Sequence, residues 1–152
     1  MKLIDIRTIS FADIWAASNI DALLAEYAEE SSLSGLPTPV PLRDLYELLE
    51  QSGSCVLLGA YKGDELVGFL AMVVSMNPHY SQVLAVTESY FVASEHRKTG
   101  AGLRLLTAAE SLAKAKGAIG ILVSAPVQSR LAQVMPGVGY RETTRAFFRS
   151  LA

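Results

Sequence analysis

The spacing of apolar residues changes twice along the chain, and this change limits the possible folds more than any other feature. Apolar side chains recur at helical spacing over residues 20–28, over residues 42–49 and again over residues 100–116. Between them, residues 55–92 are rich in β-branched and aromatic residues, and the string KGD at 62–64 separates two such runs. This pattern predicts a hairpin followed by a further strand. Helical segments on both sides of consecutive strands predict one mixed sheet with helices on its faces.

The complete pattern predicts a mixed α/β fold with the element order β-α-α-β-β-β-α-β-α-β. The expected strands cover residues 2–8, 55–61, 65–75, 83–92, 119–125 and 140–151. The expected helices begin after Ser18, at Pro41, at Gly100 and near Gln128. No repeat, low-complexity segment or linker divides the sequence, so we expect a single domain over residues 1–152.

Composition excludes several classes of function. The net charge is −2, so no basic field is available for general binding of nucleic acid. No apolar run approaches the length of a membrane span, and we expect no membrane partner. The single cysteine, Cys55, allows no internal disulfide, which fits a cytoplasmic protein, and its apolar run indicates a buried residue rather than a nucleophile. Two distant histidines without neighbouring ligands predict no metal site.

The stretch VASEHRKTGAGLRLL, residues 92–106, joins an expected strand to an expected helix. The first turn of a helix has free backbone N–H groups and the positive end of the helix dipole. Gly100 and Gly102 remove side chains where a ligand would approach the backbone, and Arg97 and Lys98 add positive charge. These features predict an anion site, and a phosphate group is the anion that fits best.

Two nucleotide motifs fail at this turn. The chain has no Gly-x-x-x-x-Gly-Lys-Ser/Thr string, and Leu105 stands where the dinucleotide fingerprint requires its third glycine. The string RKTGAG, residues 97–102, instead matches the pattern Arg/Gln-x-x-Gly-x-Gly/Ala between a strand and a helix. On this string, on the longer stretch 90–117 and on the GY pair at 139–140, the chain resembles the GNAT superfamily of acyl-CoA N-acyltransferases. The expected element order also resembles that fold.

The resemblance implies that acetyl-CoA is the co-substrate and assigns it a binding site. The backbone amides of the turn would hold the pyrophosphate; these residues are Arg97, Lys98, Thr99, Gly100, Ala101, Gly102 and Leu103. The main chain of Tyr90, Phe91 and Val92 would pair with the pantetheine arm, in a gap between this strand and the strand expected at 119–125. The alternative is an ordinary strand-to-helix turn whose glycines serve tight packing.

Glu88 is the candidate for the general base that takes a proton from the amine. It lies in the apolar stretch VLAVTESYFV, where burying a carboxylate is costly unless it has a partner or a purpose. Regular alternation along a strand would place Glu88 and Tyr90 on one face, with Ser89 on the other. The alternative is a glutamate that forms a salt bridge or lies exposed at the sheet edge.

The acid that protonates the leaving thiolate is less clearly indicated. Members of the resembling family often carry a tyrosine four residues before the late glycine, where this chain has Met135. Tyr140 or Tyr90 would then substitute, the thiolate would leave unaided, or the protein would not catalyse. The backbone N–H of Val92 is the donor that the resemblance implies for the developing oxyanion.

The expected function is therefore an N-acetyltransferase that joins the acetyl group of acetyl-CoA to a primary amine by direct attack in a ternary complex. The alternatives are a non-catalytic acyl-CoA-binding module or sensor, and an interaction protein that keeps only the fold. Glu30 on an early helix, together with His79 and Tyr80 in the connector NPHYSQ, could border the acceptor; a solvated helix face and an exposed turn are the alternatives. The resemblance also allows a homodimer.

Overall fold

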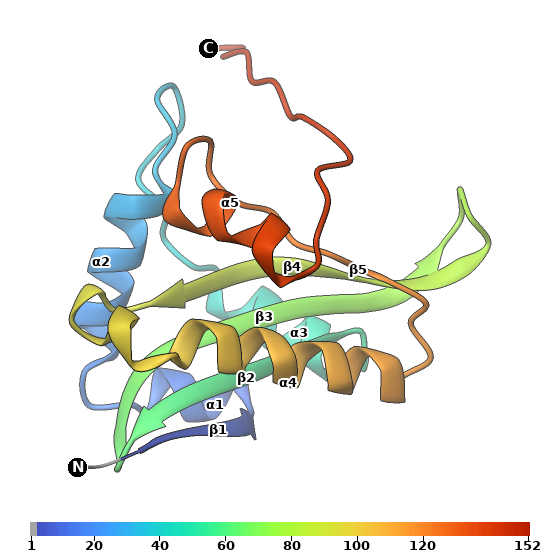
Figure 1. Ribbon diagram of the computed structural model, residues 1–152. Coiled ribbons are helices and arrows are strands. Elements are labelled where there is room, and N and C mark those ends of the chain that lie inside the picture. The colour runs from blue at the N-terminus through green and yellow to red at the C-terminus, as the bar shows by residue number, and fades with distance from the viewer. Residues whose placement is uncertain (1–2) are drawn as a thin grey trace.

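A five-stranded mixed sheet with helices on both faces forms the molecule, as seen in a computed structural model that describes residues 3–152 (Figure 1). The strands are β1 (Ile4–Ile9), β2 (Cys55–Lys62), β3 (Glu65–Asn77), β4 (Gln82–Val92) and β5 (Ile121–Leu122). They lie in the order β1-β2-β3-β4-β5. Neighbouring strands are antiparallel except β4 and β5, which are parallel.

Five α-helices and two short 3₁₀ helices connect or cover the strands. The α-helices are α1 (Phe11–Trp15), α2 (Ile20–Ser31), α3 (Arg43–Gln51), α4 (Ala101–Ala115) and α5 (Arg130–Val134). The 3₁₀ helices are η1 (Ser94–Thr99) and η2 (Met135–Val138). Within the described chain, no helix is long and apolar enough to cross a bilayer.

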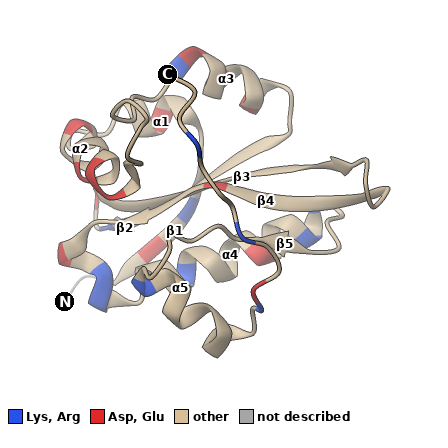
Figure 2. Cartoon of the chain, turned by 90° about the horizontal axis from the view of Figure 1, so that it is seen from above, with Lys and Arg blue, Asp and Glu red and all other residues tan. Residues whose placement is uncertain are grey.

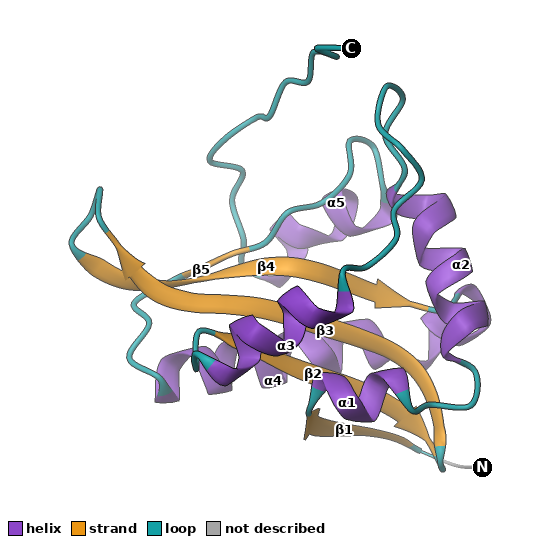
Figure 3. Cartoon of the chain, turned by 180° about the vertical axis from the view of Figure 1, so that it is seen from behind, coloured by secondary structure: helices purple, strands orange, loops and turns teal. Residues whose placement is uncertain are grey.

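Each face of the sheet has its own hydrophobic core. On one face, α4 packs its buried Leu105 and Ala109 against Leu70 and Met72 of β3. This follows from the amphipathic spacing in α4, which leaves Arg104 and Thr107 exposed. On the other face, α1, α2 and α3 cover the sheet (Figure 3). There the core contains buried residues of the helices and strands, among them Phe11, Ile14, Leu23, Leu57, Phe69 and Phe91.

The sequence predicted the sheet, the hairpin turn and the helix after the glycine turn, and the structure confirms these elements. Two expectations about the element order were wrong. A short additional helix, α1, follows β1, because Ser10 and Asp13 form a reciprocal capping box at its start. The strand expected over 140–151 is absent, and these residues form no regular secondary structure. A strand needs a neighbouring edge, and β5 has only two residues to offer one.

Candidate functional site

A β-bulge in the middle of β4 sets the direction of Glu88. In the register with β3, Ser89 pairs with Ala71 and Thr87 pairs with Met72, so Glu88 is an extra residue without a partner. The bulge reverses the alternation of side chains after it. Glu88 therefore faces the α1–α3 side, whereas Tyr90 packs on the α4 side. The expectation that these two side chains share a face was wrong, because a regular strand was assumed.

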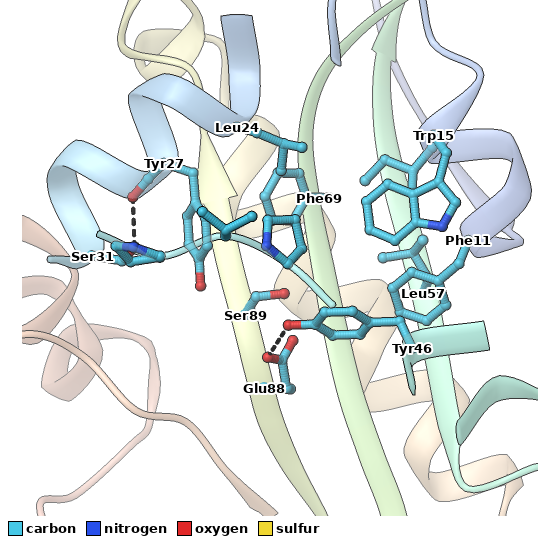
Figure 4. Close-up of a pocket in the computed structure, with 14 residues that line it drawn as sticks. Phe11, Trp15, Leu24, Tyr27, Ser31, Tyr46, Leu57, Phe69, Glu88 and Ser89 are labelled. Carbon is cyan, nitrogen blue, oxygen red and sulfur yellow. Dashed lines mark hydrogen bonds between the residues drawn. The ribbon is translucent and has the colours of Figure 1, made fainter. Parts of the chain in front are cut away.

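The Glu88 side chain lies at a cavity of about 270 Å³ between the sheet and the α1–α3 layer. Five aromatic residues line it, and Figure 4 shows them around the carboxylate: Phe11, Trp15, Tyr27, Tyr46 and Phe69. The loop that carries Pro39, Val40 and Pro41 closes another side. Glu88 is the one charged residue of β4 (Figure 2). The cavity can therefore hold an apolar group beside a single negative charge.

Tyr46 of α3 holds the Glu88 carboxylate in place. Its hydroxyl donates a hydrogen bond of 2.5 Å to Oε1 of Glu88. Burial and this bond raise the pKa of Tyr46, so the hydroxyl stays protonated as a donor. Burial and the charge of Glu88 also raise the pKa of Tyr27. Glu88 itself is exposed, not buried as its apolar neighbours in sequence indicated, because the bulge directs it to the open cavity.

The second half of the site is the edge of β4 beyond the bulge. Pairing with β5 is confined to Ala85 and Val86, and the N–H of Ser124 already donates to the Thr87 side chain, at 3.1 Å. The edge from Ser89 to Val92 therefore has no strand beside it in the described structure. The N–H of Ala93 points to β3 and donates to Val67. By alternation, the N–H groups of Tyr90 and Val92 point to the open edge.

The glycine turn follows directly on this edge. Gly100 has a left-handed backbone conformation with φ of +83°, and no atom lies within 4 Å of an added Cβ. Gly102 has no such constraint, and an added Cβ there would come no closer than 3.6 Å to another atom. Among the described residues, no hydrogen bond uses the N–H groups of Gly102 or Leu103 at the start of α4. The turn therefore presents free donors and the positive end of a fifteen-residue helix.

The guanidinium group of Arg97 is engaged outside the part of this turn that is expected to bind phosphate. Its guanidinium donates to the carbonyl of Val92 at 2.8 Å and pairs with Glu30 of α2 at 2.5 Å. Lys98 is exposed, and no ion pair within residues 3–152 involves it. Arg97 therefore joins the end of β4 to α2. Glu30 pairs with Arg97 and does not line the cavity, contrary to the role considered from the sequence.

The two tyrosines considered as acids both lie on the α4 side. The Tyr90 hydroxyl donates to the carbonyl of Gly102, and burial, with the charges of Tyr140 and Glu110, raises the pKa of Tyr90 to about 12. Burial and the charge of Glu110 likewise raise the pKa of Tyr140 to about 12. The buried Tyr140 hydroxyl has no hydrogen-bond partner among the described residues. Neither tyrosine lines the cavity that contains Glu88, and Met135 is buried.

Three other residues singled out from the sequence lie away from the cavity. His79 and Tyr80 lie in the turn of the β3–β4 hairpin, where their N–H groups donate to Oδ1 of Asn77. This hairpin projects from the end of the sheet in Figure 1. Cys55 is buried in β2, and burial raises the pKa of its thiol to about 11. No group of three or more metal-ligating side chains occurs in the part of the chain that the structure describes.

Tyr46 and the aromatic lining were not predicted from the sequence as parts of the site. Tyr46 has the helical spacing of a core residue, and Phe11 and Trp15 also have the pattern of core residues. No local pattern in the sequence distinguishes these residues from ordinary core residues. Their convergence on Glu88 depends on contacts between residues far apart in sequence, as in the pair of Tyr46 and Glu88.

Comparison with family models gives one match, to the acetyltransferase (GNAT) family, over residues 20–132. The matched region contains Glu88, the open edge of β4 and the glycine turn. It covers more than half of the chain. Comparison with curated protein sequences gives no match.

Solved structures with the same fold differ in what their names describe. An aminoglycoside acetyltransferase from an uncultured soil metagenomic sample is 18% identical, with a TM-score of 0.75 and coverage of 99% of this chain and 97% of that one. A ribosomal-protein-alanine N-acetyltransferase from Brucella melitensis biovar Abortus 2308 is 20% identical, with a TM-score of 0.73 and coverage of 96% and 97%. A transcriptional regulator from Bacillus halodurans C-125 is also 20% identical, with a TM-score of 0.76 and coverage of 96% and 98%. At these identities the likeness shows the fold alone.

Proposed function

This chain belongs to the acetyltransferase (GNAT) family, and we propose that it transfers the acetyl group of acetyl-CoA to a primary amine by direct attack in a ternary complex. One observation carries the proposal: two half-sites meet on five residues of β4. Glu88 lies at the aromatic cavity, and the unpaired edge that ends at Val92 leads to the glycine turn. An amine in the cavity and a thioester along the edge would therefore approach each other across this strand.

The free groups of the turn and the edge fit the parts of acetyl-CoA. The N–H groups of Gly102 and Leu103 would bind the pyrophosphate, with Lys98 as the nearby cation in sequence. The outward N–H groups of Tyr90 and Val92 would pair with the amides of the pantetheine arm or stabilise the thioester oxygen. When bound, acetyl-CoA supplies an acetyl group activated as a thioester.

Glu88 takes the role of the general base in this proposal. Tyr46 holds Oε1, and no hydrogen bond among the described residues involves Oε2, which is therefore available to accept a proton from the ammonium. The neutral amine forms a C–N bond to the acetyl carbon, and the C–S bond breaks. The nitrogen then loses its second proton, and the thiolate leaves as the thiol after gaining a proton. Met135 is buried without an acidic group, so that last proton comes from the nitrogen, from water or from Tyr140.

A non-catalytic acyl-CoA-binding module is the second candidate, and Met135 is the observation that favours it. A thioether cannot donate a proton, and the two nearby tyrosines lie on the α4 side. This candidate keeps the turn and the β4 edge as a binding site. It differs from the enzyme in that it binds acetyl-CoA but releases no thiol from it in the presence of an amine.

The test combines binding and turnover. Calorimetry should detect binding of acetyl-CoA, and a screen of primary amines should release free thiol from it. Glu88→Gln should lower kcat by roughly 10²–10⁴-fold with acetyl-CoA affinity unchanged. Glu29→Gln is the matched control, since Glu29 is exposed on α2 and does not line the cavity.

Binding without thiol release from any amine would favour the sensor. Full turnover in the Glu88→Gln variant would remove Glu88 from the proposed mechanism. The absence of any binding of acetyl-CoA would contradict both candidates together.

A further inference from the structure

The aromatic residues of the cavity come in two groups. Phe11, Trp15 and Tyr46 belong to α1 and α3, and their ring centroids lie between 5.0 and 6.1 Å apart. Tyr27 and Phe69 belong to α2 and β3, with centroids 5.4 Å apart. In Figure 4, Tyr27 lies on one side of the Glu88 carboxylate, and Trp15 and Phe11 lie on the other. A ligand between the groups would be surrounded by ring faces and edges, which favour an apolar or aromatic body.

The charges around the cavity allow one cationic group in the ligand. Glu88 is the single charged side chain among the described residues that line the cavity. Two acidic side chains of α2 are used elsewhere: Glu26 accepts from the N–H of Ser94 at 2.8 Å, and Glu30 pairs with Arg97. On the other side, the guanidinium of Arg43 lies 4.9 Å from the centre of the Trp15 ring. A second ammonium group inside the cavity would find no further carboxylate among the lining residues.

The size and the closing loop of the cavity limit the ligand further. A volume of about 270 Å³ lies below the range of roughly 300–1,000 Å³ that is typical of drug-sized ligands. Pro39 and Pro41 line the cavity and have no backbone N–H to offer. A peptide would therefore find few donors for its carbonyl groups on that side. A compact molecule without amide groups fits better than a peptide or an oligosaccharide.

We infer that the acceptor is a compact primary monoamine with an aromatic body, whose ammonium group lies at Glu88 and whose ring lies between Tyr27 and the Phe11–Trp15 pair. The inference rests on the proposed acetyl transfer and narrows its acceptor. Polyamines, aminoglycosides and peptide amines are the classes that the cavity disfavours. The fold alone does not make this choice, because the names of structurally similar proteins describe quite different acceptors.

Trp15 provides a direct readout of amine binding, because it lines the cavity and is the only tryptophan in the chain. The first experiment titrates the protein with 2-phenylethylamine, spermidine and trialanine and follows tryptophan fluorescence. We expect saturable binding of 2-phenylethylamine with a Kd lower by roughly tenfold or more than those of the other two amines. Equal or tighter binding of spermidine or trialanine would overturn the inference, as would fluorescence that no amine changes.

A charge added to the closing loop gives a second, independent test. Val40 lines the cavity but is 82% exposed, so Val40→Asp should fold normally and place a second carboxylate beside the ligand. The preference for 2-phenylethylamine over 1,4-diaminobutane should fall by roughly two- to fivefold. Val127→Asp is the matched control, since Val127 is 89% exposed and does not line the cavity. An unchanged preference in the Val40 variant would contradict selection by this cavity.

The proposed transfer and the inferred acceptor class can fail separately. Calorimetry with acetyl-CoA and thiol release test the transfer, and fluorescence tests the amine class. If spermidine is acetylated efficiently and 2-phenylethylamine is not, the transfer stands and the inferred acceptor is wrong. If acetyl-CoA does not bind, the proposed transfer is wrong, whatever the amine titrations give.

Discussion

The two half-sites that meet on β4 are built in opposite ways. The glycine turn is a continuous piece of chain, from the end of β4 through η1 to the first residues of α4. The cavity takes its lining from α1, α2, α3, the loop after α2 and three strands, over residues 11–89. A contiguous turn can be preserved while the rest of the chain changes, whereas an assembled cavity changes with every helix that borders it. This difference explains how one fold can serve unlike acceptors.

The helix α2 contacts both half-sites, and its helical spacing explains how. Glu26 and Glu30 are four residues apart and bind the η1 part of the turn, at Ser94 and Arg97. Tyr27 and Ser31 are also four residues apart and line the cavity. Residues i and i+4 share a face of a helix. Two adjacent faces of α2 therefore join the turn to the cavity.

The largest effect is expected at the turn, where Gly100→Trp would break the proposed phosphate site. Charge-assisted hydrogen bonds contribute about 1.5–3 kcal/mol each, so losing two of them should lower acetyl-CoA affinity by roughly 100-fold or more. Calorimetry measures the change. Gly53→Trp is a matched control, because Gly53 has a φ of +80° and the same open surroundings but lies after α3. If both variants lose affinity equally, the effect is on folding and not on the turn.

The next largest effect is a loss of stability that should differ between the two faces of the sheet. Leu70 is 0% exposed below α4, and Leu57 is 1% exposed but lines the cavity. Leu70→Ala should lower the free energy of unfolding by about 2–5 kcal/mol, and Leu57→Ala by an amount near the lower end of that range, because space beside it already exists. Urea denaturation measures both. A larger loss for Leu57 would mean that the cavity face is packed as tightly as the α4 face.

A smaller effect is expected at the short helix that carries three cavity residues. The Ser10 side chain accepts from the N–H of Asp13 at 3.0 Å, and Asp13 accepts from the N–H of Ser10 at 2.9 Å. Ser10→Ala should lower the free energy of unfolding by about 1 kcal/mol. Trp15 fluorescence should change as well, because α1 holds this side chain at the cavity.

The same capping box gives a pH dependence. Hydrogen bonds from Ser10 lower the pKa of Asp13 in the folded protein. A lowered folded pKa adds stability above the pKa of the unfolded chain, and this stability is lost as the pH falls through the folded pKa. Urea denaturation between neutral and acidic pH should therefore show a shallower loss of stability for Asp13→Asn, which removes the titrating carboxylate, than for the natural protein. A parallel pH dependence in both proteins would contradict this role of the box.

The smallest effect separates two roles of Glu30. If Glu30 serves only as the partner of Arg97 in a half-exposed ion pair, the loss of its charge has a small effect. Glu30→Gln should then lower the free energy of unfolding by less than about 1 kcal/mol and leave the KM for the amine unchanged. If Glu30 instead bordered the acceptor, the other role that the sequence allowed, Glu30→Gln would raise that KM. Steady-state kinetics with the best amine of the screen distinguishes the two. Glu29→Gln is again the control, on the same helix.

Much of the α4 half of the molecule could be predicted from the sequence. The apolar spacing of residues 100–116 predicted α4, and the string RKTGAG, together with its place between a strand and a helix, predicted the turn. Both signals are local, since helix periodicity and glycine conformation depend on residues within a few positions. The role of the Arg97 side chain could not be predicted in this way, because its ion-pair partner Glu30 lies 67 positions away in the sequence.

The cavity half depended on long-range contacts that no local pattern contains. The bulge at Glu88 arises from the register between β3 and β4, and Tyr46 meets Glu88 across forty-two positions of sequence. The segment 140–151 has the pattern of a strand but gains no partner, because β5 ends after two residues. The sequence by itself determined the central strands, the longer helices and the residue types of the turn, because their patterns are local. Tertiary structure decided which way Glu88 faces and what surrounds it, because register and packing are settled only between segments far apart in the chain.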